Sequence, residues 1–233
     1  MIDIGKNFGL VRARIAAAAD RCGRDAVDIK LVAVTKTHPA GALRQAIAAG
    51  ACALGENKVQ EAESKIEELG RDAAEWHLIG HLQSNKGRRA VQLFDVIHSL
   101  DSLELAQRLE RICEEEAKQA LSVLLQIDLA GEETKSGVPI TEMLDIAEYL
   151  KTCKRLRFDG LMVLPPFFGD PEATRPYFQS LRGIRDELAA QGAFGERKGE
   201  LSMGMSHDFE VAIEEGATIV RVGTAIFGGR DYN

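Results

Sequence analysis

Short runs of consecutive apolar residues alternate along this chain with longer stretches in which apolar residues recur every three or four positions. Runs such as LVAV and VLLQI predict buried strands of a parallel sheet, and the longer period predicts amphipathic helices. The predicted strands cover residues 29–36, 52–55, 76–80, 95–100, 122–129, 158–164, 200–204 and 218–223. The predicted helices cover residues 11–21, 40–49, 59–69, 86–94, 102–120, 141–153, 172–190 and 206–215.

About eight strands, each except the last followed by a helix, are what a (β/α)8 barrel requires. A doubly wound open sheet is the alternative, and it would normally show a glycine-rich turn after its first strand. Here the first strand is followed by Lys36, Thr37, His38 and Pro39, without a glycine. We therefore predict an α/β fold made of one (β/α)8 TIM barrel, a single domain over residues 1–233.

The composition is that of a globular chain long enough to build a core without disulfides or metal ions. The chain has 233 residues, 45% of them hydrophobic, and a formal net charge of −7. The acidic balance disfavours nucleic-acid partners, and no apolar run approaches the roughly 20 residues of a membrane span. No signal peptide is recognisable, and the four scattered cysteines form no C-x-x-C pair. We expect a cytoplasmic protein with reduced cysteines, no membrane partner and no metal site.

Lys36 is the most informative of the polar residues at the predicted strand ends, where barrels of this kind place their active sites. It ends the apolar run LVAVTK, so its side chain is expected at the barrel mouth. Partial loss of water there favours the neutral amine, which Schiff-base chemistry with an aldehyde requires. The simpler interpretation, which this segment alone leaves open, is a solvated lysine in a salt bridge.

The loops after the last two predicted strands are where such barrels bind phosphate. Ser206 is predicted to cap the helix that follows, where its hydroxyl and the nearby N–H groups can hold an anion. After the last strand, Gly223 allows close approach of a ligand, and Thr224 adds a hydroxyl and an N–H group. The alternative is a pair of ordinary glycine turns and a helix start favoured by Asp208 and Glu210.

Arg221 stands two residues before Gly223, on a strand that should otherwise be apolar. An arginine inside a barrel needs a partner, which can be a phosphate or a ring nitrogen of a bound heterocycle. A buried salt bridge with Asp128 or Glu56 is the alternative. An aldehyde for Lys36, a phosphate and a heterocyclic ring together describe pyridoxal 5′-phosphate (PLP).

Six segments follow one another along the chain: LVAVTKTHP, GENKVQE, WHLIGHLQSNK, GLMVLPP, LSMGMSHDFEVAI and VRVGTAIFG. In this order they resemble the signatures of the YggS/PROSC family of PLP homeostasis proteins, and the resemblance extends over essentially the whole chain. It implies the fold of the N-terminal barrel of alanine racemase, which belongs to fold type III of the PLP-dependent proteins.

The resemblance also implies a cofactor site formed by Lys36, Asn57, His81, Ser202, Met203, Ser206, Arg221, Gly223 and Thr224. By this resemblance Lys36 forms the internal aldimine with PLP, and Asn57 lies beside the cofactor. Arg221 faces the pyridine nitrogen.

The same resemblance assigns the remaining residues to the phosphate and the pocket walls. Ser206, Gly223 and Thr224 bind the phosphate. Ser202 and Met203 line the pocket, while His81 lies near its rim.

The expected ring partner bears on whether the protein is an enzyme. PLP enzymes that use the ring as a full electron sink typically pair its nitrogen with a carboxylate, whereas an arginine disfavours protonation of that nitrogen. A racemase also needs a second acid/base, which in alanine racemase comes from a C-terminal β-domain of the partner subunit. We expect no such domain, since the chain ends about ten residues after the last strand. Tyr149 and Tyr177 are expected away from the mouth, and Tyr232 lies in the tail.

The leading hypothesis is a PLP carrier or buffer in intracellular PLP homeostasis, without robust amino-acid catalysis and without catalytic residues. One alternative is a small PLP-dependent amino-acid racemase or lyase. Another is an aldolase without cofactor that uses Lys36 directly on a sugar phosphate. Apo PLP-dependent enzymes are the expected recipients of the cofactor, and a monomer is expected.

Overall fold

A closed ring of eight parallel strands forms the centre of the computed structural model, which describes residues 2–131 and 137–229. The ring runs β1-β2-β3-β4-β5-β7-β8-β9, with β4 paired to β5 and β9 paired back to β1. The strands are β1 (Lys30–Val34), β2 (Ala53–Glu56), β3 (Glu75–Leu78), β4 (Val96–Leu100), β5 (Leu121–Asp128), β7 (Leu156–Met162), β8 (Glu200–Ser202) and β9 (Ile219–Val222). The predicted (β/α)8 barrel is therefore confirmed.

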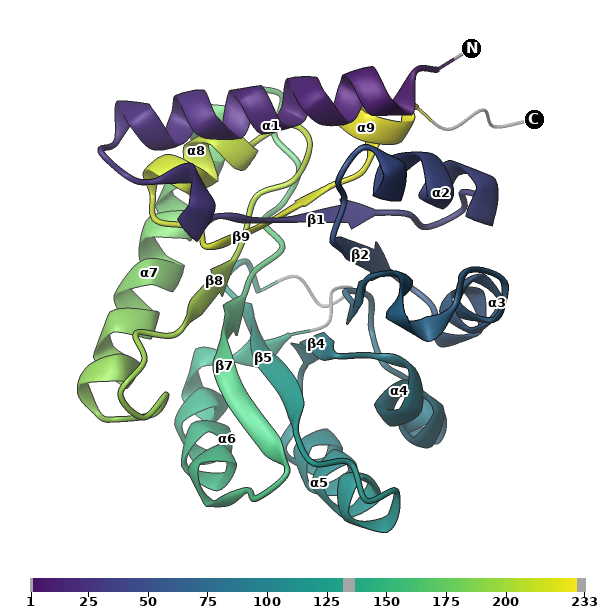
Figure 1. Cartoon of the computed structure of the whole chain (residues 1–233). Coiled ribbons are helices and arrows are strands. Elements are labelled where there is room, and N and C mark those ends of the chain that lie inside the picture. The colour runs from purple at the N-terminus through teal and green to yellow at the C-terminus, as the bar shows by residue number, and fades with distance from the viewer. Residues whose placement is uncertain (1, 132–136, 230–233) are drawn as a thin grey trace.

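Helices surround the ring on its outside (Figure 1). They are α1 (Ile4–Arg21), α2 (Ala40–Ala48), α3 (Val59–Leu69), α4 (Gly87–Leu93), α5 (Leu103–Glu115), α6 (Ile140–Thr152), α7 (Arg175–Ala190), α8 (Phe209–Glu214) and α9 (Thr224–Phe227). Within residues 2–131 and 137–229, short 3-10 helices span Ala26–Asp28, Arg71–Ala73, Ser84–Lys86 and Pro171–Thr174. Because each strand is followed by a helix, every strand runs in the same direction and all the C-terminal strand ends open on one side.

Two groups of buried apolar side chains pack on the two faces of the ring. The larger group joins the outward strand residues to the helices, as a parallel sheet covered by helices requires. The smaller group contains only strand residues and fills part of the barrel interior: Val32, Ala53, Val96, Leu124, Met162 and Ile219. Since side chains alternate between the two faces of a strand, Val32 and Ile219 show which positions of β1 and β9 face inward.

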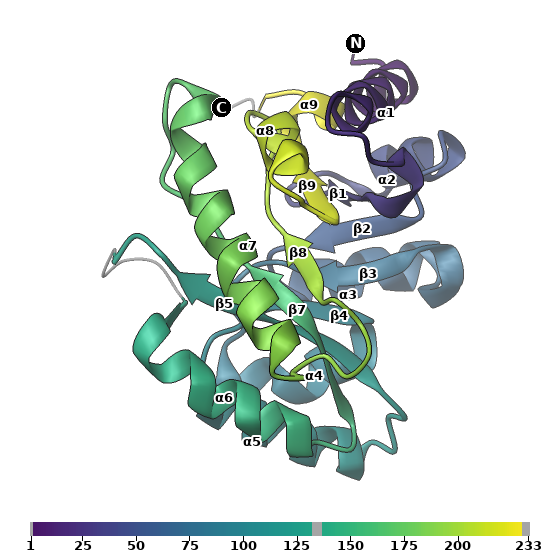
Figure 2. The same ribbon diagram turned by 90° about the vertical axis from the view of Figure 1, so that its left-hand side faces the viewer.

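Helix α1 precedes the first strand and packs against α8, α9 and α2, as Figures 1 and 2 show from two sides. It begins at Ile4, seven residues before the predicted start, because the Asp3 carboxylate caps it by accepting a hydrogen bond from the Lys6 N–H at 2.9 Å. Its Arg14 and Arg21 pair with Glu210 and Glu214 of α8. The helix thus ties the beginning of the chain to its last barrel unit.

Two short elements were not predicted, and two further helix boundaries differ from the prediction for local reasons. The last strand is followed by a short helix, α9, and a two-residue strand, β6 (Val138–Pro139), pairs with the end of β5. Helix α5 stops at Glu115 because Ala117 adopts a left-handed φ of 51°. Helix α8 begins at Phe209 with Asp208 as its N-cap, so the prediction that Ser206 caps this helix is wrong.

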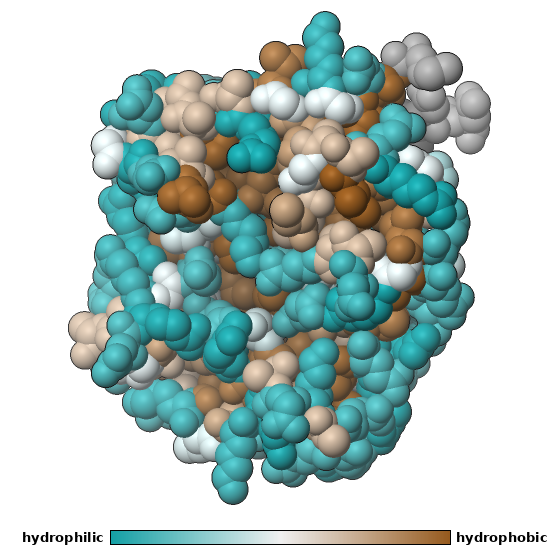
Figure 3. Space-filling model, viewed as in Figure 1, coloured by the Kyte–Doolittle hydropathy of each residue, from teal (hydrophilic) through white to brown (hydrophobic). Residues whose placement is uncertain are grey.

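The surface in the view of Figure 3 is mostly hydrophilic, and hydrophobic side chains gather just below α1. No helix among the described residues is both long and apolar enough to cross a membrane. All four cysteines are free, and Cys52 is exposed rather than part of the core.

Candidate functional site

Lys36 lies just beyond the end of β1, at the mouth side of the barrel, and is half-buried. The strand ends earlier than predicted, at Val34, but the Thr35 N–H still donates to the Gly55 carbonyl at 2.9 Å. Because alternation continues from the inward-facing Val32, position 36 shares the interior face of the ring. The structure therefore places Lys36 where the sequence predicted it.

The backbone on both sides of Lys36 is held by a buried cluster that sequence reasoning missed. Lys65 Nζ lies 2.6 Å from Glu56 Oε1 and 2.7 Å from Glu61 Oε1, and it donates to the Thr35 carbonyl at 2.7 Å. Thr35 donates its hydroxyl to Glu56, and Glu61 accepts the Thr37 N–H. The only hint in the sequence was the spacing of four between Glu61 and Lys65 on one helix.

Thr37 directly follows the lysine and adopts a left-handed φ of 68°. This conformation is strained for a β-branched residue, typically by about 1–3 kcal/mol. The Glu61 contact compensates by binding its N–H, so the turn that presents Lys36 has a fixed shape.

Burial also acts on Glu56, which is inaccessible to water. Burial raises the pKa of its carboxyl group, although the hydrogen bonds from Lys65 and Thr35 act in the opposite direction. Its second oxygen, Oε2, is buried without a hydrogen-bond partner among the described residues. Lys65 therefore supplies the positive charge that compensates for the buried Glu56 carboxylate beside the site.

A cluster of N–H groups and one hydroxyl stands at the ends of β8 and β9. Ser206 Oγ accepts hydrogen bonds from the Gly223 N–H at 3.1 Å and the Ala225 N–H at 3.2 Å. Thr224 lies between them and is exposed. The three predicted phosphate residues are thus brought together, and Ala225, which the sequence analysis did not name, contributes a backbone donor.

Gly223 joins this cluster to the lysine segment. A Cβ at this position would lie 3.3 Å from both the Cβ and the carbonyl oxygen of Val34, two residues before Lys36. The register Ala33↔Val222 of the β1–β9 pair brings the two segments to the same height. Lys36 and the hydroxyl and N–H cluster therefore occupy neighbouring positions on the barrel rim.

Arg221 points into the barrel interior, where it is 3% exposed. Its Nη1 donates to Ser202 Oγ at 2.5 Å and its Nη2 to the Val163 carbonyl at 2.9 Å. Burial lowers the pKa of the guanidinium to about 10, so it stays charged at neutral pH. Among the described residues no carboxylate forms an ion pair with it, since Glu56 binds Lys65 and Asp128 accepts the Ala130 and Gly131 N–H groups.

Asn57 and His81 follow β2 and β3, the two strands that come after β1 in the ring. The Asn57 backbone passes so close to Gly80 that a Cβ there would lie 2.4 Å from the Asn57 carbonyl oxygen. His81 is exposed, and its Nδ1 lies 2.8 Å from the Asp101 carboxylate. The GEN and WHLIGH segments are thus in direct contact, as a shared site requires.

Ser202 and Met203 lie on opposite faces of the same strand end. Ser202 faces the interior, where its hydroxyl contacts Arg221 and also lies 2.8 Å from His98 Nδ1. Met203 is fully buried in the outer core, so only its backbone is available to a pocket in the barrel. His98 was not predicted, because nothing in the sequence shows that positions 98 and 202 meet.

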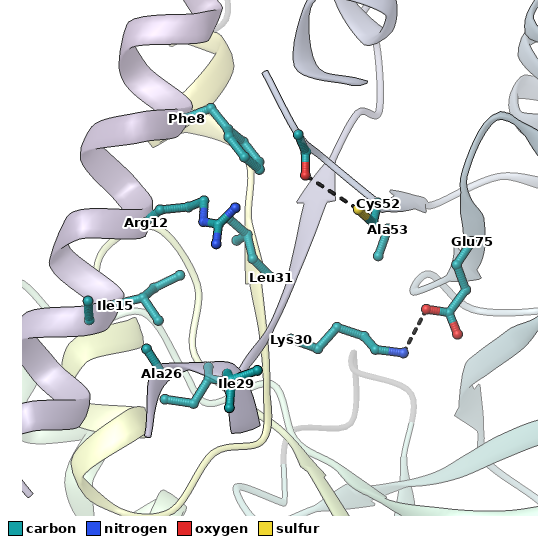
Figure 4. A pocket seen from close by; sticks show the side chains of 13 residues that line it. Phe8, Arg12, Ile15, Ala26, Ile29, Lys30, Leu31, Cys52, Ala53 and Glu75 are labelled. Carbon is teal, nitrogen blue, oxygen red and sulfur yellow. Dashed lines mark hydrogen bonds and ion pairs between the residues drawn. The ribbon is translucent and has the colours of Figure 1, made fainter. Parts of the chain in front are cut away.

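A cavity of about 500 Å³ opens at the other end of the barrel, where the strands begin (Figure 4). Its lining includes Phe8 and Arg12 of α1 together with Lys30 and Glu75, which stand at the starts of β1 and β3. None of the predicted site residues lines it. Among the described residues no cluster of three histidine, cysteine or acidic side chains is arranged to hold a metal ion.

A closed parallel barrel with a lysine after β1, a serine hydroxyl after β8 and N–H groups after β9 is typical of the alanine racemase N-terminal class. Residues 9–231 match the family described as alanine racemase, N-terminal domain. Alanine racemase from Corynebacterium glutamicum has the same fold, with a TM-score of 0.68 at 16% identity, over 96% of this chain and 61% of its own.

Relatives of greater identity define the family more narrowly. The pyridoxal phosphate homeostasis protein of Escherichia coli is 44% identical over 100% of this chain and 99% of its own length. That of Aquifex aeolicus is 44% identical over 95% and 96% of the two chains. PipY of Synechococcus elongatus, solved with PLP bound, has a TM-score of 0.81 at 40% identity and covers 92% of this chain and 100% of that one. The chain belongs to the family of pyridoxal phosphate homeostasis proteins.

Proposed function

We propose that this protein binds PLP covalently through Lys36 and serves as a carrier or buffer of PLP in the cell. One observation carries the proposal: the lysine segment lies directly against the hydroxyl and N–H cluster of the last two strand ends, above an interior arginine. The PLP-bound structure of PipY and the names of the relatives support the same cofactor.

The residues present fit the parts of PLP one by one. Ser206 Oγ accepts from the Gly223 and Ala225 N–H groups, which leaves its own hydroxyl proton to donate to a phosphate, at the position where such barrels bind one. Arg221 offers a buried positive charge to the ring nitrogen. Lys36 offers, at the same rim, the half-buried amine that Schiff-base formation with an aldehyde requires.

Bound PLP would supply an electron sink for amino-acid chemistry, and the residues around it decide how strong that sink is. Arg221 keeps its charge at neutral pH, since its pKa is lowered only to about 10. A positive charge at the ring nitrogen opposes protonation of that nitrogen and so weakens the sink. We therefore propose storage and transfer of PLP to apo enzymes, rather than robust catalysis, as the role of the site.

A small PLP-dependent racemase or lyase remains the second candidate, and one observation favours it. Tyr177 lies in the first turn of α7, and its ring centroid is 5.9 Å from that of Phe168, in the loop that follows β7. This tyrosine is therefore nearer to the mouth than the sequence suggested. A racemase would use such a phenol as its second acid/base.

The direct test is titration of the purified protein with PLP and with pyridoxal, followed by visible absorption. Lys36→Ala is expected to abolish the absorption band of bound PLP, and Lys58→Ala, at an exposed lysine of the same rim, is the control that keeps it. Ser206→Ala is expected to weaken PLP binding about tenfold, the effect of one lost hydrogen bond to a charged group, with less effect on pyridoxal. Ser64→Ala, on the exposed face of α3, is its control.

Transfer and turnover are measured with the same protein preparations. The loaded protein should restore activity to an apo PLP-dependent enzyme faster than free PLP at the same concentration does. Efficient racemase or lyase turnover that Tyr177→Phe abolishes would overturn the carrier proposal in favour of the second candidate. We further propose that the protein acts in the cytoplasm and as a monomer. Light scattering of the purified protein tests the monomeric state.

A further inference from the structure

A series of hydrogen-bonded side chains leads from Arg221 into the barrel interior. Arg221 Nη1 contacts Ser202 Oγ at 2.5 Å, and Ser202 Oγ contacts His98 Nδ1 at 2.8 Å. His98 Nε2 then lies 2.8 Å from His77 Nδ1. Ser202, His98 and His77 are inaccessible to water. We call these four residues the interior network.

The interior network continues to the end of the barrel opposite the mouth. His77 Nε2 lies 3.2 Å from Glu75 Oε2, although the N–H group is not well aligned with the oxygen. Glu75 Oε2 lies 2.6 Å from Lys30 Nζ, and both residues line the cavity of Figure 4. A carboxylate at the foot of the barrel is thus joined to the arginine beneath the mouth.

The direction of every hydrogen bond in the interior network follows from its two ends. An arginine only donates, so Ser202 accepts from Arg221, and its own proton is available to His98 Nδ1. His98 then carries its proton on Nε2 and donates to His77 Nδ1, which places the His77 proton on Nε2, facing Glu75. The reverse direction would turn the unprotonated His77 Nε2 toward the Glu75 carboxylate, which sets two acceptors against each other.

The charges at the two ends agree with this direction. The His77 side chain and the Lys30 ammonium hold the pKa of Glu75 down at about 2, so its carboxylate is charged and accepts. Burial lowers the pKa of His77 and lowers that of His98 still further, so both rings are neutral. Polar groups in this position would be costly without partners, since the rest of the interior is apolar.

We propose that His98 and His77 are positioning residues that fix the guanidinium of Arg221 toward the bound cofactor and couple it to the charge of Glu75. The inference rests on the proposed function, in which Arg221 faces the ring nitrogen of PLP. Hydrogen bonds to Ser202 and to the Val163 carbonyl hold two of the guanidinium nitrogens of Arg221. The orientation of the guanidinium therefore depends on the interior network, to which Ser202 belongs. Charge at the foot of the barrel then affects the electronic state of a cofactor at its mouth.

The first experiment needs no cofactor. Nitrogen-15 NMR of the histidine rings in the full-length protein should show His77 and His98 both neutral, with the proton on Nε2. Of the five histidines in the chain, the exposed His81 and His207 serve as internal references for rings outside the interior network. A proton on Nδ1 of either buried ring, or a positive charge on either at neutral pH, would overturn the assigned direction.

The second experiment measures the absorption spectrum of protein-bound PLP in Glu75→Gln. This change keeps the shape and an accepting oxygen but removes the charge, at a side chain that is 36% exposed, so folding should be retained. We expect a shifted absorption maximum and PLP affinity lowered severalfold. Glu68→Gln, which removes the charge of the exposed Arg44–Glu68 pair, should leave the spectrum unchanged.

His98→Asn is the stronger change, since it interrupts the interior network between Ser202 and His77. It should shift the absorption spectrum of bound PLP in the same direction as Glu75→Gln. Spectra of Glu75→Gln that superpose on those of the unchanged protein would overturn the coupling even if His98→Asn does not fold. Failure of the unchanged protein to bind PLP would instead overturn the proposed function, while the NMR experiment would still decide the direction of the interior network.

Discussion

Glu56 and Lys65 place two opposite charges, both almost inaccessible to water, directly behind the lysine of the site. Such a pair contributes little net stability compared with apolar residues, but removal of one partner leaves a buried charge uncompensated. Because Lys65 also holds the Thr35 carbonyl, the pair supports the segment that presents Lys36. The stability of the fold and the geometry of the site are therefore linked at Lys65.

Lys65→Met should lower the free energy of unfolding by about 3–5 kcal/mol, since the Glu56 carboxylate loses its counter-charge. Urea unfolding followed by circular dichroism measures the effect. Arg44→Met breaks an exposed pair with Glu68 and should cost no more than about 1 kcal/mol. Equal losses in the two variants would show that the buried pair has no special role.

Glu75 should make stability depend on pH in the acid range. Its pKa lies at about 2 in the folded protein and near 4.5 when unfolded, so the stabilisation is present above pH 4.5 and is lost as the pH falls toward 2. His77 and Lys30 are the groups that face it, and Arg157 adds a further positive charge nearby. Glu75→Gln should therefore flatten the decrease of the urea midpoint between pH 4.5 and 2. A decrease as steep as that of the unchanged protein would contradict this assignment.

Lys36, Arg221 and Gly223 could be predicted from the sequence because each stands at or near a strand end, where the chemistry of such barrels is placed. His98 could not, because it meets Ser202 across 104 positions of sequence. Such contacts depend on the register and stagger of the closed ring, which a local pattern does not contain. Whether the predicted residues bind PLP stays a prediction.

At the scale of elements, the eight predicted strands are all present, because continuous apolar runs identify strands that are buried on both faces. Short elements were harder to predict. The four-residue helix α9 and the two-residue strand β6 have no room for a hydrophobic period, and α8 begins later than expected because Asp208 accepts the Met205 N–H at 2.6 Å. This shift leaves Ser206 available to the N–H groups that follow β9.

Gly80→Ala should destabilise the barrel and displace Asn57, because the added Cβ would lie 2.4 Å from the Asn57 carbonyl oxygen. We expect a loss of about 1–3 kcal/mol in the free energy of unfolding, together with weaker PLP binding. The matched control is Gly183→Ala on the exposed face of α7, where a Cβ meets nothing within 4 Å. That change should instead stabilise by about 0.5–1 kcal/mol, and a similar loss in both variants would argue against the close contact.

For the molecule as a whole, α1 lies outside the repeating strand and helix units and connects the first of them to the last. It covers α8 and α9 (Figure 1). Its Asn7 donates to the Ile226 carbonyl at 3.0 Å. Because α9 follows the strand that carries Arg221 and Gly223, α1 supports the part of the ring where the phosphate cluster lies. Stability of the closed barrel and integrity of the site should therefore be lost together.

Phe8→Ala tests this dependence, since Phe8 is buried at 3% exposure on the inner face of α1. The cavity should cost about 3–5 kcal/mol in the free energy of unfolding, measured in urea. Leu10→Ala, at 54% exposure on the same helix, should change it by no more than about 0.5 kcal/mol. A stable Phe8→Ala protein would mean that α1 contributes little to barrel closure.

The central claim, that Lys36 holds PLP covalently at the barrel mouth, is tested most directly by borohydride reduction of the PLP-loaded protein followed by peptide mapping. Reduction should change the visible absorption band and leave a pyridoxyl group on the peptide that contains Lys36. The adduct should be absent from Lys36→Ala and present in Lys58→Ala. A pyridoxyl group on other lysines with Lys36 unmodified, or a protein that stays colourless with added PLP, would contradict the account.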